Sequence, residues 1–509
     1  MLDQLSTCTD LCFFSDDYKQ FLHQSQSSLD INAIPYSVQT VSSSLIIQNN
    51  TLINSQPYFI NAYLSTITLN NVDISNIISD SNVIEISTSN ITITNTEFSS
   101  IYNNNSNGLV IFLTSDSQMT MTNVTYSDSF MKMIRVYDSK FMISDSVITN
   151  IDAMNSDLIS VYSSEDTSIM NTMISNITSS NSRIIDVSYS TISSINNVTI
   201  NEVYTTIFRM TGSTLNNVVM LKFFNVSQAI SMTQTNLTIQ DSNFTQCGRD
   251  SIVYGGAIDL IDSTISVNSS HFISNYAQSG AAISLRCSTI SACNIDIMNN
   301  NFEQNQASTQ GGAIYYNFVR PSLVGNTFVS NDAVYGENIA SYAVRIVQIG
   351  QESNNIVLDG VASGRELINS PTSNNQSRIE LTLVDYDDQV MNLVNSSNIK
   401  IVSTNDSTQA IGTSEVRAIE GKSSFENIGF IDYPGAQNTT FMASSTEIDQ
   451  NKVQHIALST DNSITVTFRY CKPGEFINNN GTTCEECSAG TYSFKWNSTQ
   501  CTQCMDNAV

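Results

Sequence analysis

The segment Ile67-Thr68-Leu69-Asn70-Asn71-Val72-Asp73-Ile74 decides the fold, because six other segments match it without gaps. Each has apolar residues at its first and third positions, a small polar residue at its fifth and a large apolar residue at its eighth. The matching segments are Ile91–Phe98, Met119–Tyr126, Phe141–Ile148, Leu237–Phe244, Ile265–Phe272 and Ile295–Phe302. Looser copies occur near Ile169, Ile192 and Leu215, so the pattern recurs about every 22 to 30 residues.

This repeat predicts a parallel β-helix from about Ser44 to about Val344. Apolar residues two apart lie on one face of a strand, and the polar fifth residue marks a turn. One such unit cannot bury its own apolar face, but stacked copies can. We expect the turn Asn residues to stack, each side-chain amide bonding the next. A leucine-rich repeat would need recurring Leu, and a propeller blade a longer period. About twelve coils fit, roughly 55 Å of rod at about 4.8 Å each.

The composition favours an all-β protein and excludes some partners. Of the 509 residues, 40% are hydrophobic and only 13% are charged, so Asn, Ser and Thr must supply the polar surface. Those residues are poor in helix interiors. The net charge of −26 argues against nucleic acids and anionic lipid surfaces. It leaves two interpretations open, plain solubility and weak attraction for Ca²⁺, although no EF-hand spacing is present. We expect no cofactor beyond such weak Ca²⁺ binding.

Cysteines and glycosylation sequons point to an extracellular chain. Sixteen N-x-S/T sequons occur, but a chain this rich in Asn, Ser and Thr makes many by chance. We select as glycosylation candidates Asn123, Asn197, Asn236, Asn438 and Asn497. Residues 1–21 show no signal peptide pattern, and no run of 18 apolar residues exists. We therefore expect the signal and a membrane attachment to lie outside this chain.

The late coils carry a second signature. An F-x-x-N motif is followed by a glycine-rich turn and strand, as in Phe272–Asn275 with Gly280–Ile283 and Phe302–Asn305 with Gly311–Ile314. The other copies are Phe328–Asn331 with Gly336–Ile339, and Phe244–Cys247 with Gly255–Ile258. Paired F-x-x-N and G-G-A-I motifs resemble those of the chlamydial polymorphic outer membrane proteins and of large surface proteins of ciliates and other protists. The resemblance covers about Asn236 to Ala340. It implies a right-handed, pectin-lyase-like β-helix that serves in surface display and adhesion.

The sequence changes in character after the rod. Ile379–Asp385 and Ser463–Arg469 alternate apolar and polar residues and predict half-buried antiparallel strands. Between them, Gly421–Ile428 precedes the turn Tyr433-Pro434-Gly435, which resembles the later strands of bacterial Ig-like domains. We therefore expect an N-terminal cap or linker over 1–43, the β-helix over 44–344, an Ig-like β-sandwich over 345–470 and a cysteine-rich module over 471–509.

The last module has the cysteine spacing of a secreted repeat. Its five cysteines are Cys471, Cys484, Cys487, Cys501 and Cys504. With the Pro-Gly after the first Cys and the Gly-x-Tyr at Gly490–Tyr492, it resembles the ephrin-receptor-like or growth-factor-receptor type of repeat, which implies disulfide bonds. The alternative is a zinc ribbon built from the two C-x-x-C pairs. An odd number of cysteines leaves one without a partner, which suggests that further repeats follow.

The remaining five cysteines lie elsewhere in the chain. We expect Cys287 and Cys293 to pair locally, with Cys247 nearby one coil earlier. Cys8 and Cys12 are candidates for a pair in the N-terminal cap.

The sequence gives little support for catalysis, so we expect a chain that is not an enzyme. Glycoside hydrolases of this fold class need paired carboxylates, and the lyases need Ca²⁺ and a basic residue. The rod is poor in Lys and Arg, and His23, His271 and His455 lie in separate regions. His271 should point outward from the rod. The acidic cluster Asp385, Asp387 and Asp388 is either a solvated loop or a weak Ca²⁺ site.

Two functions remain as hypotheses. The first is a non-catalytic structural or adhesion ectodomain at the cell surface, whose partners are surface or matrix proteins or glycans. The alternative is a secreted carbohydrate-active β-helix protein, either an enzyme or a glycan binder. A cleft lined by three or more carboxylates with exposed aromatic residues would favour the alternative.

Overall fold

A computed structural model describes most of the chain. The described ranges are 12–13, 28–30, 38–42, 44–53, 60–79, 81–102, 108–153, 156–178, 183–248, 252–349, 356–365, 378–454, 463–478 and 480–505. The chain divides into two compact units, Met1–Ala340 and Ser341–Val509. We describe each unit by itself.

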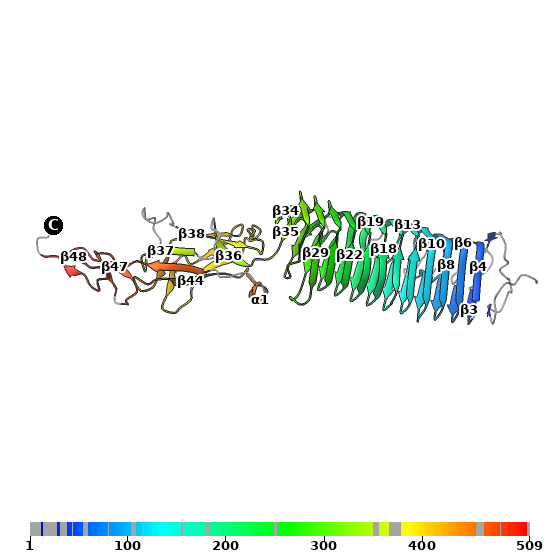
Figure 1. The fold of residues 1–509 in the computed structure, drawn as a ribbon, viewed down its shortest axis with the longest axis horizontal. Coiled ribbons are helices and arrows are strands. Elements are labelled where there is room, and N and C mark those ends of the chain that lie inside the picture. Colours follow the sequence, from blue (N-terminus) through cyan, green and yellow to red (C-terminus); the bar gives the residue numbers. More distant parts are fainter. Residues whose placement is uncertain are drawn as a thin grey trace, which may run out of the picture. The chain divides into compact units, whose positions relative to one another are not determined.

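The first unit is a parallel β-solenoid of about eleven turns (Figure 1). Its strands form three faces. Within a face, each strand pairs in parallel with a strand one coil away, 21 to 31 residues along the chain. The first face holds the apolar pair that opens each repeat. Its strands are β4 (Ser44–Ile53), β6 (Thr66–Ile78), β8 (Asn90–Tyr102), β10 (Gln118–Ser129), β12 (Lys140–Ser144), β15 (Thr167–Met170), β18 (Thr191–Asn196), β20 (Thr214–Val219), β22 (Asn236–Gln240), β25 (Thr264–Asn268) and β29 (Asn294–Met298).

The second face carries the large apolar residue that closes each repeat. It consists of the second halves of β4, β6, β8 and β10, then of β13 (Val147–Asp152), β16 (Met173–Thr178), the start of β19 (Thr199–Thr211), the start of β21 (Lys222–Thr233), β23 (Asn243–Cys247), β26 (His271–Ile273), β30 (Asn301–Glu303) and β33 (Thr327–Val329). Before them, β2 (Ser28–Asp30) pairs in parallel with β4.

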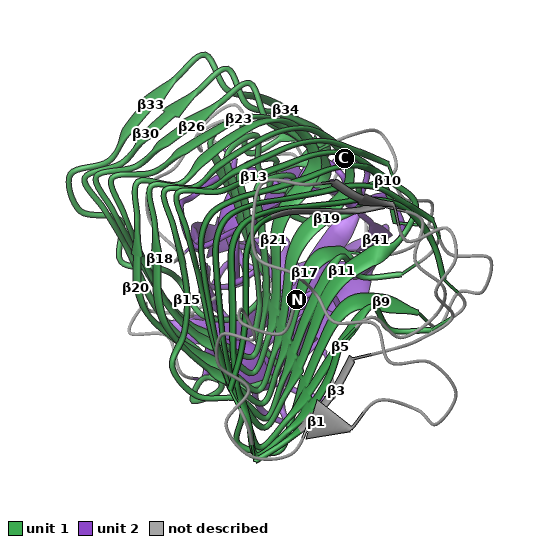
Figure 2. Ribbon diagram, turned by 90° about the vertical axis from the view of Figure 1, so that its right-hand side faces the viewer, with its two compact units in different colours: residues 1–340 green, residues 341–509 purple. Residues whose placement is uncertain are grey.

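The third face completes each coil. Its strands are β3 (Val38–Val41), β5 (Ile60–Tyr63), β7 (Ile84–Ser87), β9 (Leu109–Thr114), β11 (Lys132–Tyr137), β14 (Ile159–Tyr162), β17 (Arg183–Ser188), the ends of β19 and β21, β24 (Ile258–Ile261), β28 (Ile283–Arg286), β32 (Ile314–Tyr316) and β35 (Ile339–Ala340). The late coils add a short sheet of β27 (Tyr276–Ser279), β31 (Gln306–Gln310) and β34 (Asp332–Tyr335), and β1 (Cys12–Phe13) runs antiparallel to β3. Figure 2 shows the coils of this unit end on.

The solenoid core consists of stacked apolar columns. The first and third residues of the repeat, such as Ile67 and Leu69, are fully buried. The eighth residues stack on one another, with ring centroids 4.8 Å apart for Phe244 and Phe272 and 4.9 Å for Phe272 and Phe302. This separation matches the spacing of hydrogen-bonded strands, so each ring packs on the ring of the next coil.

The predicted turn ladder is present. Asn71, Asn95 and Asn123 all have positive φ values of 51 to 55°, a left-handed conformation that Asn adopts more easily than most residues. The Nδ2 of Asn71 donates to Oδ1 of Asn49 at 2.7 Å, and the Nδ2 of Asn123 donates to Oδ1 of Asn95 at 2.7 Å. The polar fifth residue is thus both a turn former and a link between coils.

A second ladder, of buried hydroxyls, lies where the third face turns into the first. The N–H of Ser65 donates to Oγ of Ser89 at 2.8 Å, and the Oγ of Ser65 donates to the carbonyl of Tyr63 at 2.8 Å. The same pair of bonds recurs coil after coil. Its members are Ser65, Ser89, Ser117, Ser139, Ser164, Ser190, Ser213, Thr235 and Ser263. Each hydroxyl pairs a backbone N–H that would otherwise be buried without a partner.

In the late coils, the Asn of F-x-x-N forms a buried ladder. The Nδ2 of Asn305 donates to the carbonyl of Phe272 at 2.9 Å and to Oδ1 of Asn331 at 2.9 Å. Its Oδ1 accepts the N–H of Asn275 at 3.1 Å. The glycines that follow are also structural. A Cβ on Gly312 would lie 2.0 Å from the carbonyl oxygen of Glu337, so the turn of one coil touches the next too closely for any side chain.

The second unit contains a β-sandwich. A three-stranded sheet is formed by β36 (Arg345–Gln348), β38 (Arg378–Val384) and β42 (Lys422–Glu426). A five-stranded sheet has the order β37 (Ile356–Val361), β45 (Ser463–Phe468), β44 (Thr439–Ser445), β39 (Asn398–Ser403) and β41 (Glu415–Arg417). A small pair, β40 (Gln409–Gly412) and β43 (Ile428–Ile431), and one helical turn, α1 (Gln450–Val453), complete it.

Both strands predicted here from alternation are present, with two differences. β38 is antiparallel to both neighbours, but Leu381, Thr382, Leu383 and Val384 are all buried, so it is not half-exposed. β45 is antiparallel to β44 but parallel to β37. The assignment of the sandwich to the Ig-like class stays a prediction.

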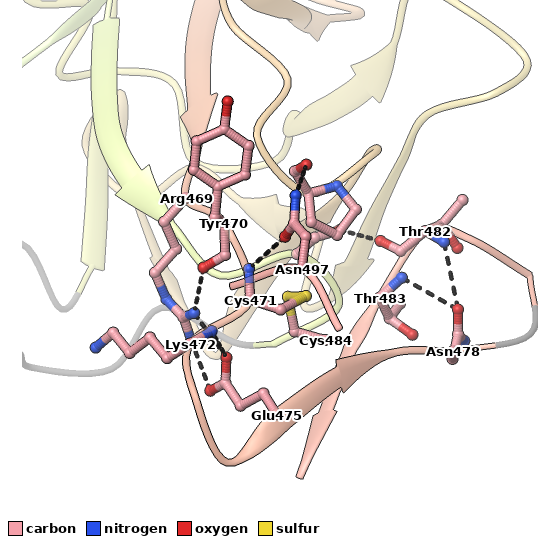
Figure 3. Close-up of a disulfide and its surroundings, with 12 residues drawn as sticks. Arg469, Tyr470, Cys471, Lys472, Glu475, Asn478, Thr482, Thr483, Cys484 and Asn497 are labelled. Carbon is pink, nitrogen blue, oxygen red and sulfur yellow. Dashed lines mark hydrogen bonds and ion pairs between the residues drawn. A yellow bond between two sulfur atoms is a disulfide. The ribbon is translucent and has the colours of Figure 1, made fainter. Parts of the chain in front are cut away.

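The cysteine-rich module packs on the sandwich through polar contacts. Its hairpins are β46 (Glu475–Ile477) with β47 (Cys484–Glu486), and β48 (Thr491–Tyr492) with β49 (Thr502–Gln503). Arg469 donates two hydrogen bonds to the carboxylate of Glu475, from Nη1 at 2.7 Å and from Nη2 at 2.9 Å (Figure 3). Asn497 accepts the N–H of Cys471 at 2.8 Å and donates to the carbonyl of Pro434 at 3.3 Å. These bonds hold the start of the cysteine-rich module against the sandwich.

Glu475 is the charged centre of this contact. Burial opposes its ionisation, but the Arg469 guanidinium, the Lys472 N–H and nearby Arg365 outweigh burial and hold its pKa below the ordinary value. A carboxyl whose pKa is depressed by folding stabilises the fold above its unfolded pKa. That stabilisation is lost as the pH falls through its folded pKa.

Replacing Asn305 with Leu should destabilise the solenoid by about 2 to 4 kcal/mol, because buried groups on both neighbouring coils lose their partners. Urea unfolding followed by far-ultraviolet circular dichroism measures this, since the single Trp lies in the other unit. Asn294→Leu, at an exposed position in the same coil, is the matched control and should change stability by less than about 0.5 kcal/mol. Equal effects of the two changes would contradict a stabilising ladder.

Replacing Glu475 with Gln should lower the stability of the second unit by about 1 to 3 kcal/mol at pH 7. The difference between the variant and the unchanged protein should shrink as the pH falls from 7 to 3, because the protonated Glu475 also loses its charge-assisted bonds. Fluorescence of Trp496 during unfolding reports the change. Glu485→Gln alters an exposed carboxylate of the same module and should have little effect. A pH-independent difference would show that charge at Glu475 is unimportant.

Candidate functional site: a groove on the third face of the solenoid

A row of exposed tyrosines marks the third face. Tyr137 ends β11, Tyr162 ends β14, and Tyr189 follows β17 one coil further on. The rings of Tyr137 and Tyr162 stack with centroids 5.3 Å apart, and Tyr189 meets Tyr162 edge-on at 5.7 Å. These side chains are 41 to 62% exposed. Soluble proteins rarely group large aromatic residues on their surface without a function.

Two ion pairs lie beside this row. Asp186 accepts two bonds from Arg209, at 2.6 Å from Nε and 3.0 Å from Nη2. Asp157 accepts the backbone N–H of Arg183 at 3.0 Å, and the Arg183 guanidinium lies 3.9 Å away. The hydrogen bond to Asp186 holds the pKa of Arg209 above its ordinary value. Both carboxylates are therefore held in fixed positions.

The tyrosines and carboxylates border one shallow groove. Its volume is about 350 Å³. Side chains from β11, β14 and β17, together with Asp157, line it: Arg135, Tyr137, Asp157, Ser160, Val161, Tyr162, Asp186 and Ser188. The parallel register sets Arg135 beside Ser160, and Ser160 beside Asp186, so residues 25 or 26 apart in sequence become neighbours.

Two cations of β11 belong to this region: Arg135 lines the groove, and Lys132 stands three residues earlier on the strand, outside the groove lining. Arg135 is exposed and Lys132 is half-buried, and both belong to β11. Partial burial, then repulsion by Arg135, lowers the pKa of Lys132, and Asp157 offsets this only in part. Neither cation has an ion-pair partner among the residues that the structure describes.

The sequence did not predict this groove. Its residues come from the stretch where the repeat is loosest, and they belong to the third strand of the coil, which the aligned segments do not include. The available signal was a recurrence of polar residues one coil apart, from Arg135 to Ser160 to Asp186. The cleft expected for a carbohydrate-active protein had three carboxylates or more, whereas this groove has two.

Other residues considered for a site lie apart from the groove. His271 is exposed on β26, as predicted, and His23 and His455 lie outside the described residues. Asp385 is not in a solvated loop: it is fully buried and accepts the N–H groups of Asp387 and Gln389, both at 2.9 Å. It therefore stabilises a turn after β38, and Asp388 pairs with Arg345. Among the described residues no group of three or more His, Cys, Asp or Glu is arranged to hold a metal ion.

The cysteines form three disulfides within the described part of the chain. Cys287 pairs with Cys293, Cys471 with Cys484, and Cys487 with Cys501. The predicted local pair Cys287–Cys293 is therefore confirmed. Cys247 is a free thiol buried in the core at the ladder position of its coil, and burial raises its pKa. Cys504 is also free, and the suggested pair of Cys8 with Cys12 lies outside the described side chains.

The disulfides decide between the two interpretations of the last module. A zinc ribbon would bring Cys484, Cys487, Cys501 and Cys504 to one ion. Instead, Cys484 and Cys487 belong to two different disulfides. Disulfides of this kind form in oxidising compartments, so the chain is secreted or extracellular. In the part that the structure describes, no helix has the length and apolarity needed to span a membrane.

The five glycosylation candidates fall into two groups. The Nδ2 atoms of Asn123 and Asn197 donate to turn residues of the preceding coil, at 2.7 and 3.0 Å, and that of Asn497 bonds Pro434. Asn236 and Asn438 are both exposed, and neither side-chain amide donates a hydrogen bond within the described residues. An N-linked glycan is attached to the Asn Nδ2 atom. In the first group this atom is already hydrogen-bonded to the protein, and in the second group it is available for a glycan.

Comparison with known proteins adds little. No family model matches the chain, and no curated protein matches it. Among solved structures, a mutant tailspike protein of E. coli bacteriophage HK620 in complex with a pentasaccharide is 10% identical, with a TM-score of 0.20, over 81% of this chain and 84% of that one. The same tailspike mutant in complex with a hexasaccharide is 10% identical, with a TM-score of 0.20, over 78% of this chain and 74% of that one. Scores this low carry no weight for function.

Expression through a eukaryotic secretory pathway should place glycans on Asn236 and Asn438 but not on Asn123, Asn197 or Asn497 in the folded protein. A glycan on a ladder amide would crowd coils that lie about 4.8 Å apart. Glycopeptide mapping of the monomeric fraction measures occupancy. Asn236→Gln should remove one glycan and leave the unfolding midpoint unchanged. High occupancy of Asn123 in folded protein would contradict the prediction.

Proposed function

We propose that this chain is a non-catalytic extracellular binding protein whose solenoid displays a glycan-recognition groove on its third face. The observation that carries the proposal is the groove itself, where stacked, exposed tyrosines lie next to carboxylates and guanidinium groups held in place by ion pairs. Tyrosine offers an apolar ring and a polar tip, which suits the mixed surface of a sugar. Polar groups fixed by their neighbours cost little entropy to order on binding.

The rigidity of the solenoid supports this role. Each groove residue lies on or directly beside a strand that is paired on both sides, so its backbone position is fixed by the ladder. Sites on strands are more precise than sites on mobile loops. The groove is shallow, and its lining comes from the neighbouring strands β11, β14 and β17, which suits one segment of a polymer.

The state of the two carboxylates supports binding without catalysis. Glycoside hydrolysis needs one carboxyl group that carries a proton and a second that faces the sugar as a base or nucleophile. Asp186 accepts one hydrogen bond from Arg209 on each of its oxygens, so this carboxylate is held as the partner of a guanidinium. Asp157 is half-exposed but stands without a second free carboxylate in the groove.

The placement at a cell surface rests on the resemblance of the F-x-x-N and G-G-A-I coils to surface-display proteins. In this proposal the groove is the contact surface, and the sandwich and cysteine-rich module belong to the stalk.

Exchange of Tyr137 and Tyr162 for Ala should abolish glycan binding or weaken it about tenfold or more, because each aromatic contact contributes on the order of 1 kcal/mol or more. Binding is measured first on an oligosaccharide array and then by calorimetry with the best ligand. Tyr433→Ala, which removes an exposed tyrosine in the second unit, is the control and should bind normally.

Two results would overturn the proposal. If the protein binds no oligosaccharide on a broad array, the groove does not recognise glycans. If the bound oligosaccharide is cleaved, and Asp157→Asn stops the cleavage, the chain is a carbohydrate-active enzyme instead.

A further inference from the structure

The outward side chains around the groove carry an unusual charge for this protein. On β11, β14, β17 and the end of β19, with Asp157 before β14, four are cationic and two are anionic: Lys132, Arg135, Arg183, Arg209, Asp157 and Asp186. Over the whole chain, acidic residues outnumber basic ones by 46 to 20. This patch therefore has the opposite sign to the protein that carries it.

After the two ion pairs are formed, two positive charges remain without an ion-pair partner among the described residues. Arg183 and Arg209 are matched by Asp157 and Asp186. Lys132 and Arg135 remain, three residues apart on one strand, where two buried residues between them turn both side chains outward. Partial burial, and after it repulsion by Arg135, lowers the pKa of Lys132. A bound anion would relieve this repulsion.

The general acidity of the protein does not cancel this local charge. Exposed charges are screened beyond about 8 Å at physiological ionic strength. Asp138 follows Tyr137 in the next turn, three residues past Arg135, which is about 10 Å along a strand. The two ends of β11 therefore differ: Lys132 begins the strand, outside the groove lining, and Tyr137 ends it and is followed by the carboxylate of Asp138.

From this arrangement we infer that the groove takes an anionic glycan, whose ring packs against Tyr137 and Tyr162 while its acidic group binds Arg135 at the groove and reaches Lys132 beside it. The inference rests on the proposed function and adds the ligand class and its orientation. Carboxylate and sulfate groups share the required chemistry. Arg135 offers a planar fork that matches either anion, and Lys132 offers a point charge.

The experiment compares three oligosaccharides of equal length: a uronic acid oligomer, its carboxyl-reduced neutral form, and a sulfated derivative of that neutral form. Calorimetry at fixed ionic strength gives each Kd for the unchanged protein, for Lys132→Met/Arg135→Met and for Lys400→Met/Lys422→Met. The last variant removes the same charge at exposed sites of the second unit and controls for net charge. Arg135→Met alone, at an exposed site, serves if the double variant does not fold.

The unchanged protein should bind an anionic oligomer about tenfold or more tightly than the neutral one. The groove variant should lose this preference while keeping its affinity for the neutral oligomer, and the control variant should keep both. Preference for uronate or for sulfate identifies the anion. Equal binding of neutral and anionic oligomers overturns this inference but leaves the proposed function standing. Absence of binding to all three, with no ligand on a broad array, overturns both.

Discussion

Every coil of the solenoid must place its turns in register with those of the coil before it, about 4.8 Å away. At the first turn the chain enters the left-handed region at one residue per coil, as at Asn71, Asn95 and Asn123. A turn in any other conformation would shift the following strand by a residue and send its apolar side chains outward. Asn contributes to the register in two ways. Its backbone tolerates the left-handed conformation, and its side chain hydrogen-bonds the neighbouring coil. Core packing, ladders and groove all depend on that register.

The buried ladders solve a problem that the turns create. A turn leaves backbone N–H groups without strand partners, and inside a narrow solenoid no water reaches them. In the early coils, serine hydroxyls such as that of Ser89 accept these groups at the turn between the third and first faces. In the late coils, the side chain of Asn305 reaches further, bonding an N–H and a carbonyl of the preceding coil. The Asn side chains replace the serines in the coils that also have close-packed glycine turns. In the coil of Asn305, the short strand β31 lies between this Asn and its glycine turn.

Much of the solenoid could be predicted because its constraint repeats. The apolar first, third and eighth positions, the turn residue and the F-x-x-N coils all recur in the sequence, and each recurrence fixes a column. The serine ladder was also visible, since Ser65, Ser89 and Ser117 each stand two residues before an aligned segment. It was missed because a small polar residue in a serine-rich chain does not stand out. The buried state of Asp385 was missed for a different reason, because it depends on two backbone N–H groups that only the folded turn brings together.

The groove could not be predicted in the same way, because it breaks the repeat rather than following it. Outward positions on the third face face solvent, so the register places no demand on their identity, and they vary freely from coil to coil. A site on such a face is a local departure: Lys132 and Arg135 on one coil, Asp157 and Tyr162 on the next, Asp186 on the third. Their sequence separations are set only by the lengths of the coils, which here vary with the loops. The solenoid makes these residues neighbours without requiring any motif, and function on this fold must therefore be sought in columns of the structure.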